Sequence, residues 1–115
     1  MSKTEITLTE LKNIAYINGY VVLNFSSTIA KLYFAVLGLS SEAKKAKGLT
    51  IIDPKGEAII FIDDNQPNET QLFALAHEMG HIVLNHKENK LTPEQQEKEA
   101  EQFANAILSK GSVKI

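Results

Sequence analysis

The sequence predicts an α+β fold, in which a small antiparallel sheet packs on two C-terminal helices and one N-terminal helix. Two apolar runs joined by a turn predict a β-hairpin, and segments with helix-capping residues lie before and after it. The chain has 115 residues, of which 43% are hydrophobic, and this suits one compact core. We therefore expect a single domain over residues 1–115, with a helix and strand in 1–47 and the hairpin and two helices in 48–111.

Capping residues define the N-terminal helix. Thr7 and Glu10 have the spacing of a capping box, and the Asn-Gly pair at 18–19 is typical of a helix end. The next segment, 20–25, is rich in β-branched and aromatic side chains and predicts a strand. Residues 28–37 are mostly apolar and fit either a buried helix or a strand. The helix is our preferred interpretation of this segment.

The hairpin is the clearest pattern in the sequence. Its apolar runs, Gly48–Ile52 and Ala58–Asp63, flank a turn that contains Pro54 and Gly56. Proline and glycine at these positions are typical of a tight connection between antiparallel strands. We therefore expect these two runs to pair.

Two helices are expected after the hairpin. Asn68 is positioned to cap the first helix, which runs to about residues 85–86. Thr92 is positioned to cap the second, with Pro93 at the first helical position and a glutamine in the capping-box position. This second helix is expected to end near residues 109–111.

Composition excludes several kinds of site. The absence of cysteine excludes disulfides, thiolate zinc sites, iron–sulfur clusters and cysteine nucleophiles. The net charge of −2, with 12 lysines and no arginine, argues against direct nucleic-acid binding, and the basic cluster at 44–47 is typical of a solvated loop. Without a signal-peptide pattern or a long apolar run, we expect a cytoplasmic protein with no membrane partner.

The first of the two C-terminal helices contains the motif His-Glu-x-x-His. His77 and His81 lie one turn apart and about 40° apart around the helix, so both imidazoles can reach one ion. Glu78 is placed to take a proton from water and pass it to a leaving amine. Gly80 lets a second backbone approach. The alternative is a buried helix with two accidental histidines, but the helix is otherwise nearly all apolar, so these polar groups need a partner.

A catalytic zinc site needs a third protein ligand. His86 lies nine residues after His77, about half a turn away from the histidine pair, and is expected at the rim or in solvent. Three glutamates of the last helix are candidates for this third ligand. Glu97 is favoured because it shares the stripe of the apolar residues three and seven positions later, while Glu99 and Glu101 stay open as alternatives.

Residues 72–86 and 97–108 together resemble the ImmA/IrrE family of zinc metallopeptidases, in the short form typical of phages and mobile elements. The resemblance covers about residues 48–108 and pairs a His-Glu-x-x-His helix with a later glutamate-bearing helix. It implies a zincin-like metallopeptidase domain with one Zn²⁺ per chain. It also implies that His77, His81 and Glu97 ligate the ion while Glu78 acts as the catalytic base.

The resemblance further implies a protein substrate. Characterised relatives cleave a helix-turn-helix transcriptional repressor, which derepresses the phage or mobile element. Glu101 stands where relatives usually carry Asn or Asp. It would orient His77 or His81 without itself binding the ion. The alternative function is an anti-repressor module that binds without cleaving and holds zinc only as a structural ion. The ligand set also suits Mn²⁺ or Fe²⁺.

Two further expectations concern the substrate. The strand Ala58–Ile62 is a candidate open edge on which an extended substrate pairs through its main chain, or simply half of the core sheet. No oxyanion donor is obvious. Tyr16, Tyr20 and Tyr33 are the bulky side-chain donors available, although a core or surface position suits each tyrosine better.

Overall fold

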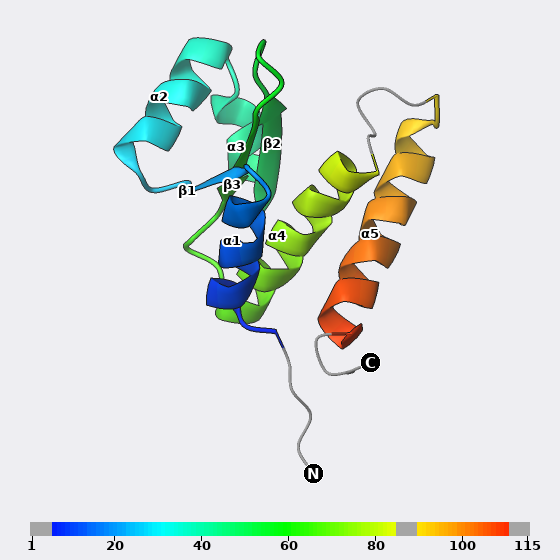
Figure 1. Ribbon diagram of the computed structural model, residues 1–115. Helices are drawn as coiled ribbons and strands as arrows, with labels where there is room; N and C mark the ends of the chain where they lie inside the picture. The colour runs from blue at the N-terminus through cyan, green and yellow to red at the C-terminus, as the bar shows by residue number, and fades with distance from the viewer. Residues whose placement is uncertain (1–5, 85–89, 111–115) are drawn as a thin grey trace.

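A computed structural model describes residues 6–84 and 90–110. It shows an α+β arrangement, as the sequence predicts (Figure 1). In chain order the elements are α1 (Leu8–Ile17), β1 (Val21–Asn24), α2 (Thr28–Leu37), α3 (Ser40–Lys45), β2 (Gly48–Ile52), β3 (Ala58–Ile62), α4 (Asn68–Val83) and α5 (Pro93–Lys110).

Three strands of the described chain form one mixed sheet in the order β1-β3-β2. The hairpin prediction is confirmed, because β2 and β3 pair antiparallel with Gly48 opposite Ile62. The expectation of an antiparallel sheet is wrong for β1, which pairs parallel to β3 with Val21 opposite Ile59. Helices α2 and α3 separate β1 from the hairpin, and such a crossover is what allows two strands to run in the same direction.

The central strand β3 divides the core into two clusters. Its side chains alternate between the two faces of the sheet. On one face Ile60 and Ile62 pack with buried residues of α1 and α4, including Leu11 and Leu75. On the other face the cluster contains Phe61 and residues of α2. All five residues of β3 are buried, because a helical layer covers each face.

The predicted helix caps are mostly confirmed. Thr7 and Glu10 form the expected capping box at α1, and Thr92 with Gln95 forms one at α5. The ambiguous segment 28–37 is helix α2, which Ser27 caps. Helix α3 is not foreseen by the sequence patterns.

The prediction that Asn68 caps α4 is wrong. Pro67 is the N-cap, and its ψ of 156° is still outside the helical region, so Asn68 is already the first helical residue. The helix ends at Val83, before the expected end at residues 85–86, which lie outside the described part of the chain. None of the helices in that part is both long and apolar enough to cross a bilayer.

Candidate metal centre

Helices α4 and α5 pack side by side in close contact (Figure 1). A Cβ atom at Gly80 would lie 3.1 Å from the Phe103 ring and 3.2 Å from the Cα atom of Ala100. Ala100 and Ala104 are fully buried. The small residues on both helices therefore let the two backbones approach, as the sequence predicts for Gly80.

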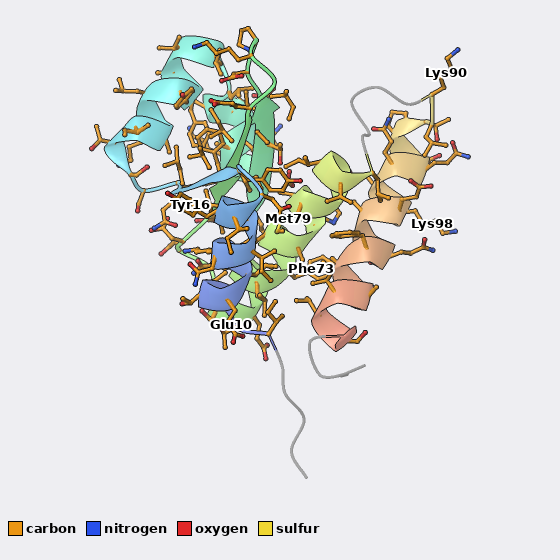
Figure 2. All side chains as sticks on the ribbon, viewed as in Figure 1. Glu10, Tyr16, Phe73, Met79, Lys90 and Lys98 are labelled. Carbon is orange, nitrogen blue, oxygen red and sulfur yellow. The ribbon has the colours of Figure 1, made fainter. Side chains whose placement is uncertain are left out.

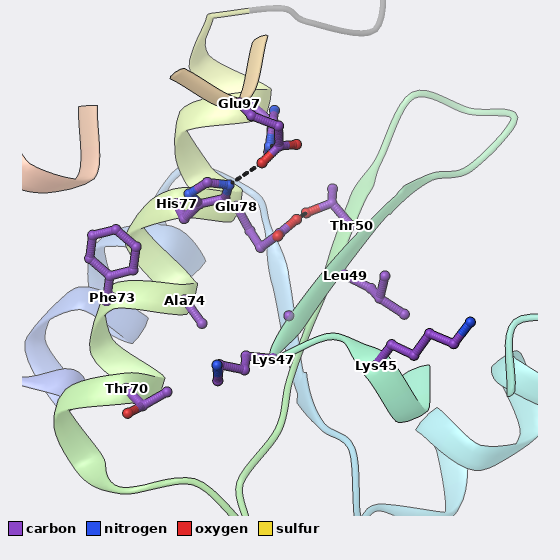
Figure 3. A pocket seen from close by; sticks show the side chains of 12 residues that line it. Lys45, Lys47, Leu49, Thr50, Thr70, Phe73, Ala74, His77, Glu78 and Glu97 are labelled. Atoms are coloured by element: carbon purple, nitrogen blue, oxygen red, sulfur yellow. Dashed lines mark hydrogen bonds and ion pairs between the residues drawn. The ribbon is translucent and has the colours of Figure 1, made fainter. Parts of the chain in front are cut away.

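Three predicted metal ligands come together across this contact. Oε1 of Glu97 lies 2.9 Å from Nε2 of His77 (Figure 3). Oε2 of the same carboxylate lies 3.2 Å from Nε2 of His81. One ligand atom from each residue lies within 4.8 Å of the other two. Two imidazole nitrogens and a carboxylate oxygen form a donor set that suits a divalent ion such as zinc.

The arrangement leaves the group open on one side. The Glu97 side chain is 65% exposed, whereas the two histidine side chains are each 20% exposed. A structural zinc site is normally closed by four protein ligands, whereas a catalytic site keeps one position open. This group of three ligands therefore fits the catalytic kind of site.

The other glutamates of α5 do not belong to this group. Among the described residues the ligand atoms that gather are those of His77, His81 and Glu97, without Glu99 or Glu101. Glu101 is exposed. Nδ1 of His77 is buried without a hydrogen-bond partner in the described chain, so the expectation that Glu101 orients one of the histidines is wrong for His77 and stays a prediction for His81. His86 lies outside the described residues.

Glu78 follows the first histidine and faces the sheet. It is half-buried, and its Oε1 accepts a hydrogen bond of 2.5 Å from the hydroxyl of Thr50 on β2 (Figure 3). Burial raises the pKa of Glu78 above its ordinary value of 4.5, while the hydrogen bond from Thr50 and the charge of His77 act in the opposite direction. A carboxylate with a raised pKa is a stronger proton acceptor.

A cleft of about 550 Å³ runs between α4 and β2 beside these residues. His77, Glu78 and Glu97 lie at one end of it, and Figure 3 shows the lysines of the β2 side toward the other end. The residues that line the cleft are Lys45, Lys47, Gly48, Leu49, Thr50, Thr70, Phe73, Ala74, His77, Glu78, His81 and Glu97.

The strand at the cleft is β2, so the expectation of an open edge at Ala58–Ile62 is wrong. That segment is the central strand, paired on both sides. Asp63 N–H donates to the Lys47 carbonyl at 3.0 Å. Hydrogen-bonded and non-hydrogen-bonded pairs alternate along an antiparallel ladder, so the main-chain groups of Gly48 and Thr50 point away from β3. The sheet thus presents unpaired N–H and C=O groups at this edge.

The three tyrosines lie elsewhere, and none lines the cleft. Tyr16 is 79% exposed on α1 (Figure 2). Tyr33 packs edge-on against Phe61, and Tyr20 packs against the cluster that includes α1 and α4. Their expected positions in the core or at the surface are therefore confirmed, and they offer no oxyanion donor.

Sequence reasoning missed Gly48 and Thr50. A Cβ atom at Gly48 would lie 3.2 Å from Cγ of Glu78, so the missing side chain lets β2 approach the helix. The available signal was weak: a glycine and a threonine alternate on one face of an otherwise apolar strand. Only the register of the hairpin against α4 shows which residue they face.

A His-Glu-x-x-His helix whose neighbour supplies a carboxylate beside an open cleft is the arrangement of a metallopeptidase-type site. The family of the IrrE N-terminal-like domain, a peptidase family, matches residues 32–110, and the chain belongs to this family. The resemblance noted from the motifs is thereby confirmed. The match runs from α2 through α5 and includes the whole cleft. No curated protein and no solved structure gave a match.

Proposed function

We propose that the protein is a zinc-dependent endopeptidase in which His77, His81 and Glu97 hold the ion and Glu78 is the general base. The observation that carries this proposal is the gathering of three ligand atoms within 4.8 Å, from two helices, beside an open cleft. The Glu78 carboxylate accepts a hydrogen bond from the Thr50 hydroxyl at one oxygen. Its pKa is raised, as a general base requires.

The proposed reaction is hydrolysis of a peptide bond. A divalent ion in this site would polarise the scissile carbonyl and make water a better nucleophile. Glu78 accepts a proton from the attacking water as the new C–O bond forms. It then returns the proton to the amide nitrogen as the C–N bond breaks, which releases an amine and a carboxylic acid, and the acid then gives its proton to solvent. Glu78 thus ends the cycle ionised, as it began.

The open edge of β2 supports an extended peptide as the substrate. The N–H and C=O groups of Gly48 and Thr50 can pair with the main chain of such a segment, and main-chain pairing does not depend on its side chains. Lys45 and Lys47 flank the same cleft. The candidate metal ligands line this cleft together with Gly48 and Thr50, so a segment paired with β2 would lie beside them.

The substrate we propose is a helix-turn-helix repressor of a phage or mobile element, whose cleavage in the cytoplasm would release transcription. Family membership over residues 32–110 supports this choice. Cleavage within an extended linker of such a repressor would suit the β2 edge, because a linker can adopt the strand conformation without unfolding a domain.

The test is the Glu78→Gln variant, assayed for zinc content and for cleavage of the proposed helix-turn-helix repressor. We expect zinc to be retained and the cleavage rate to fall by about 100-fold or more, because general-base catalysis contributes a factor of this order. Glu97→Gln should behave differently and lose zinc as well as activity. Cleavage that survives Glu78→Gln would reject the assignment of the base.

The same experiment tests the non-cleaving alternative. If wild-type protein and Glu78→Gln both abolish operator binding by a repressor that stays intact on a gel, the protein is a binding module. The expected result is instead two repressor fragments with the wild-type protein and intact, operator-binding repressor with the variant.

A further inference from the structure

We propose that Thr50 is the positioning residue for Glu78: its hydroxyl holds the carboxylate in the orientation that proton transfer in the cleft requires. The inference rests on the proposed function, because it concerns the general base of that reaction. Thr50 lies on β2, across the cleft from α4, and is 28 residues away from Glu78 in the chain.

The contacts of Glu78 are asymmetric. Oγ1 of Thr50 donates to Oε1 at 2.5 Å, and no other described residue donates to this carboxylate. Glu78 lines the cleft, and its Oε2 is not among the buried side-chain polar atoms that lack a partner in the described chain. We infer that this oxygen is accessible from the cleft. One oxygen is therefore held while the other is available to water.

A second contact fixes the middle of the same side chain. Cγ of Glu78 lies 3.2 Å from the position that a Cβ atom of Gly48 would occupy, so β2 packs directly against the glutamate stem. A glutamate has several rotatable bonds and loses much rotamer freedom when it is held. The strand contacts it at the stem and at the carboxylate, which leaves few alternative orientations.

Thr50 also connects the base to the proposed substrate edge. Its N–H and C=O groups point away from β3 toward the open edge, while its side chain faces α4. A substrate that pairs with this main chain is then in fixed register with the residue that holds Glu78. The scissile bond and the base are thus positioned by the same residue of one rigid strand.

The test compares Thr50→Val with Thr50→Ser. Valine replaces the hydroxyl by a methyl group and keeps the β-branched shape that suits a strand, whereas serine keeps the hydroxyl. Thr9→Val, on the exposed surface of α1, is the matched control. Thr50→Ala is a second hydroxyl deletion, for use if the valine variant fails to fold.

Two measurements on zinc-loaded protein separate positioning from folding. The first is the affinity for acetohydroxamate, a metal chelator that gives up a proton to a neighbouring carboxylate when it binds. The second is kcat and KM for repressor cleavage. We expect Thr50→Val to lower the acetohydroxamate affinity and kcat by about 10- to 100-fold. Zinc affinity and KM should stay unchanged, and Thr50→Ser should restore most of both losses.

The outcomes distinguish this inference from the proposed function. Acetohydroxamate affinities that do not separate Thr50→Val from the wild-type protein would overturn the inference. Equal losses in the valine and serine variants would also overturn it, because they would assign the effect to packing. If the affinity depends on the Thr50 hydroxyl but the repressor stays intact, the proposed function fails while the positioning role stands.

Discussion

Asp64 and Glu78 are carboxylates whose pKa values are shifted in opposite directions by their surroundings. The hydroxyl of Ser26 donates to Asp64, and this hydrogen bond lowers the pKa of the carboxyl below its ordinary value of 3.8. Glu78 lies between α4 and β2, where burial raises its pKa. The ionised form of Asp64 therefore stabilises the fold, whereas burial makes the ionised form of Glu78 less favourable.

The first prediction is that Asp64→Ala destabilises the protein in a pH-dependent way. Asp64 accepts hydrogen bonds from the hydroxyl and the main-chain N–H of Ser26, and so ties the turn after β1 to the turn after β3. Because the site is partly exposed, we expect a loss of about 1 kcal/mol at pH 7, or about 4 °C in Tm. Thermal melts followed by circular dichroism measure it.

The sign of the pH dependence follows from the lowered pKa. The charged hydrogen bond contributes fully above the unfolded-state pKa near 3.8 and is lost as the pH falls through the lower folded-state pKa. The difference in Tm between Asp64→Ala and wild type should therefore be constant from pH 5 upward and shrink below about pH 4. A difference that grows as the pH falls would contradict the assignment.

At the scale of elements, the contact between α4 and α5 decides whether the candidate metal ligands meet. The histidines are four residues apart on α4, but Glu97 reaches them only because α5 lies against α4 at Gly80. The outer side of α5 carries charged residues, and Lys98 points away from α4 (Figure 2). The residue spacing within α4 thus places the two histidines, whereas the packing of α5 against α4 brings in Glu97.

The second prediction concerns Gly80→Ala. The new methyl group would contact Phe103 and the main chain of Ala100 at about 3.1–3.2 Å, which is tighter than ordinary packing. We expect overpacking of about 1–3 kcal/mol, reduced by the roughly 1 kcal/mol that alanine gains in helix propensity. Zinc affinity should fall as well, because the helices separate and Glu97 moves away from the imidazoles. Calorimetric zinc titration measures this.

Glu101→Ala is the matched control on α5. Glu101 is exposed, and its removal should leave zinc affinity and Tm unchanged within experimental error. A Gly80→Ala variant that binds zinc as tightly as the wild-type protein would mean that the helix spacing does not control the site.

At the scale of the whole molecule, α5 joins the rest of the described fold mainly through α4. It packs against α4, whereas α4 also contacts α1, β2 and β3. An ion held by two residues of α4 and one of α5 would act as a cross-link between α5 and the rest of the fold. Binding energy for a ligand that recognises only the folded state adds directly to stability.

The third prediction is therefore that chelation lowers the stability of the whole protein. With free zinc at about 1,000 times its dissociation constant, binding adds about 4 kcal/mol, which corresponds to a Tm difference of about 10 °C or more between zinc-loaded and EDTA-treated protein. Differential scanning calorimetry measures this shift, and added zinc should restore the higher Tm.

Glu97→Gln provides the control for this experiment. Its Tm should respond little to zinc or EDTA, because the bridge between the helices is removed. If the wild-type protein shows no zinc-dependent shift either, zinc does not bind at this site under the conditions of the melt.

The sequence predicted the parts of this protein that depend on local spacing. Capping residues located α1 and α5, and turn residues located the hairpin, because these signals act within a few residues of one another. The four-residue spacing of His77 and His81 placed both imidazoles on one helix face for the same reason. The favoured glutamate, Glu97, was also the one that the structure brings beside them.

Only the tertiary structure decided the features that depend on how distant segments meet. The parallel pairing of β1 made β3 the central strand and left β2 as the open edge, which no local pattern encodes. The choice of Glu97 over Glu99 and Glu101 required the rotation of α5 about its axis. The contact of Thr50 with Glu78 depends on the distance between a strand and a helix, which packing sets and residue spacing along the chain does not.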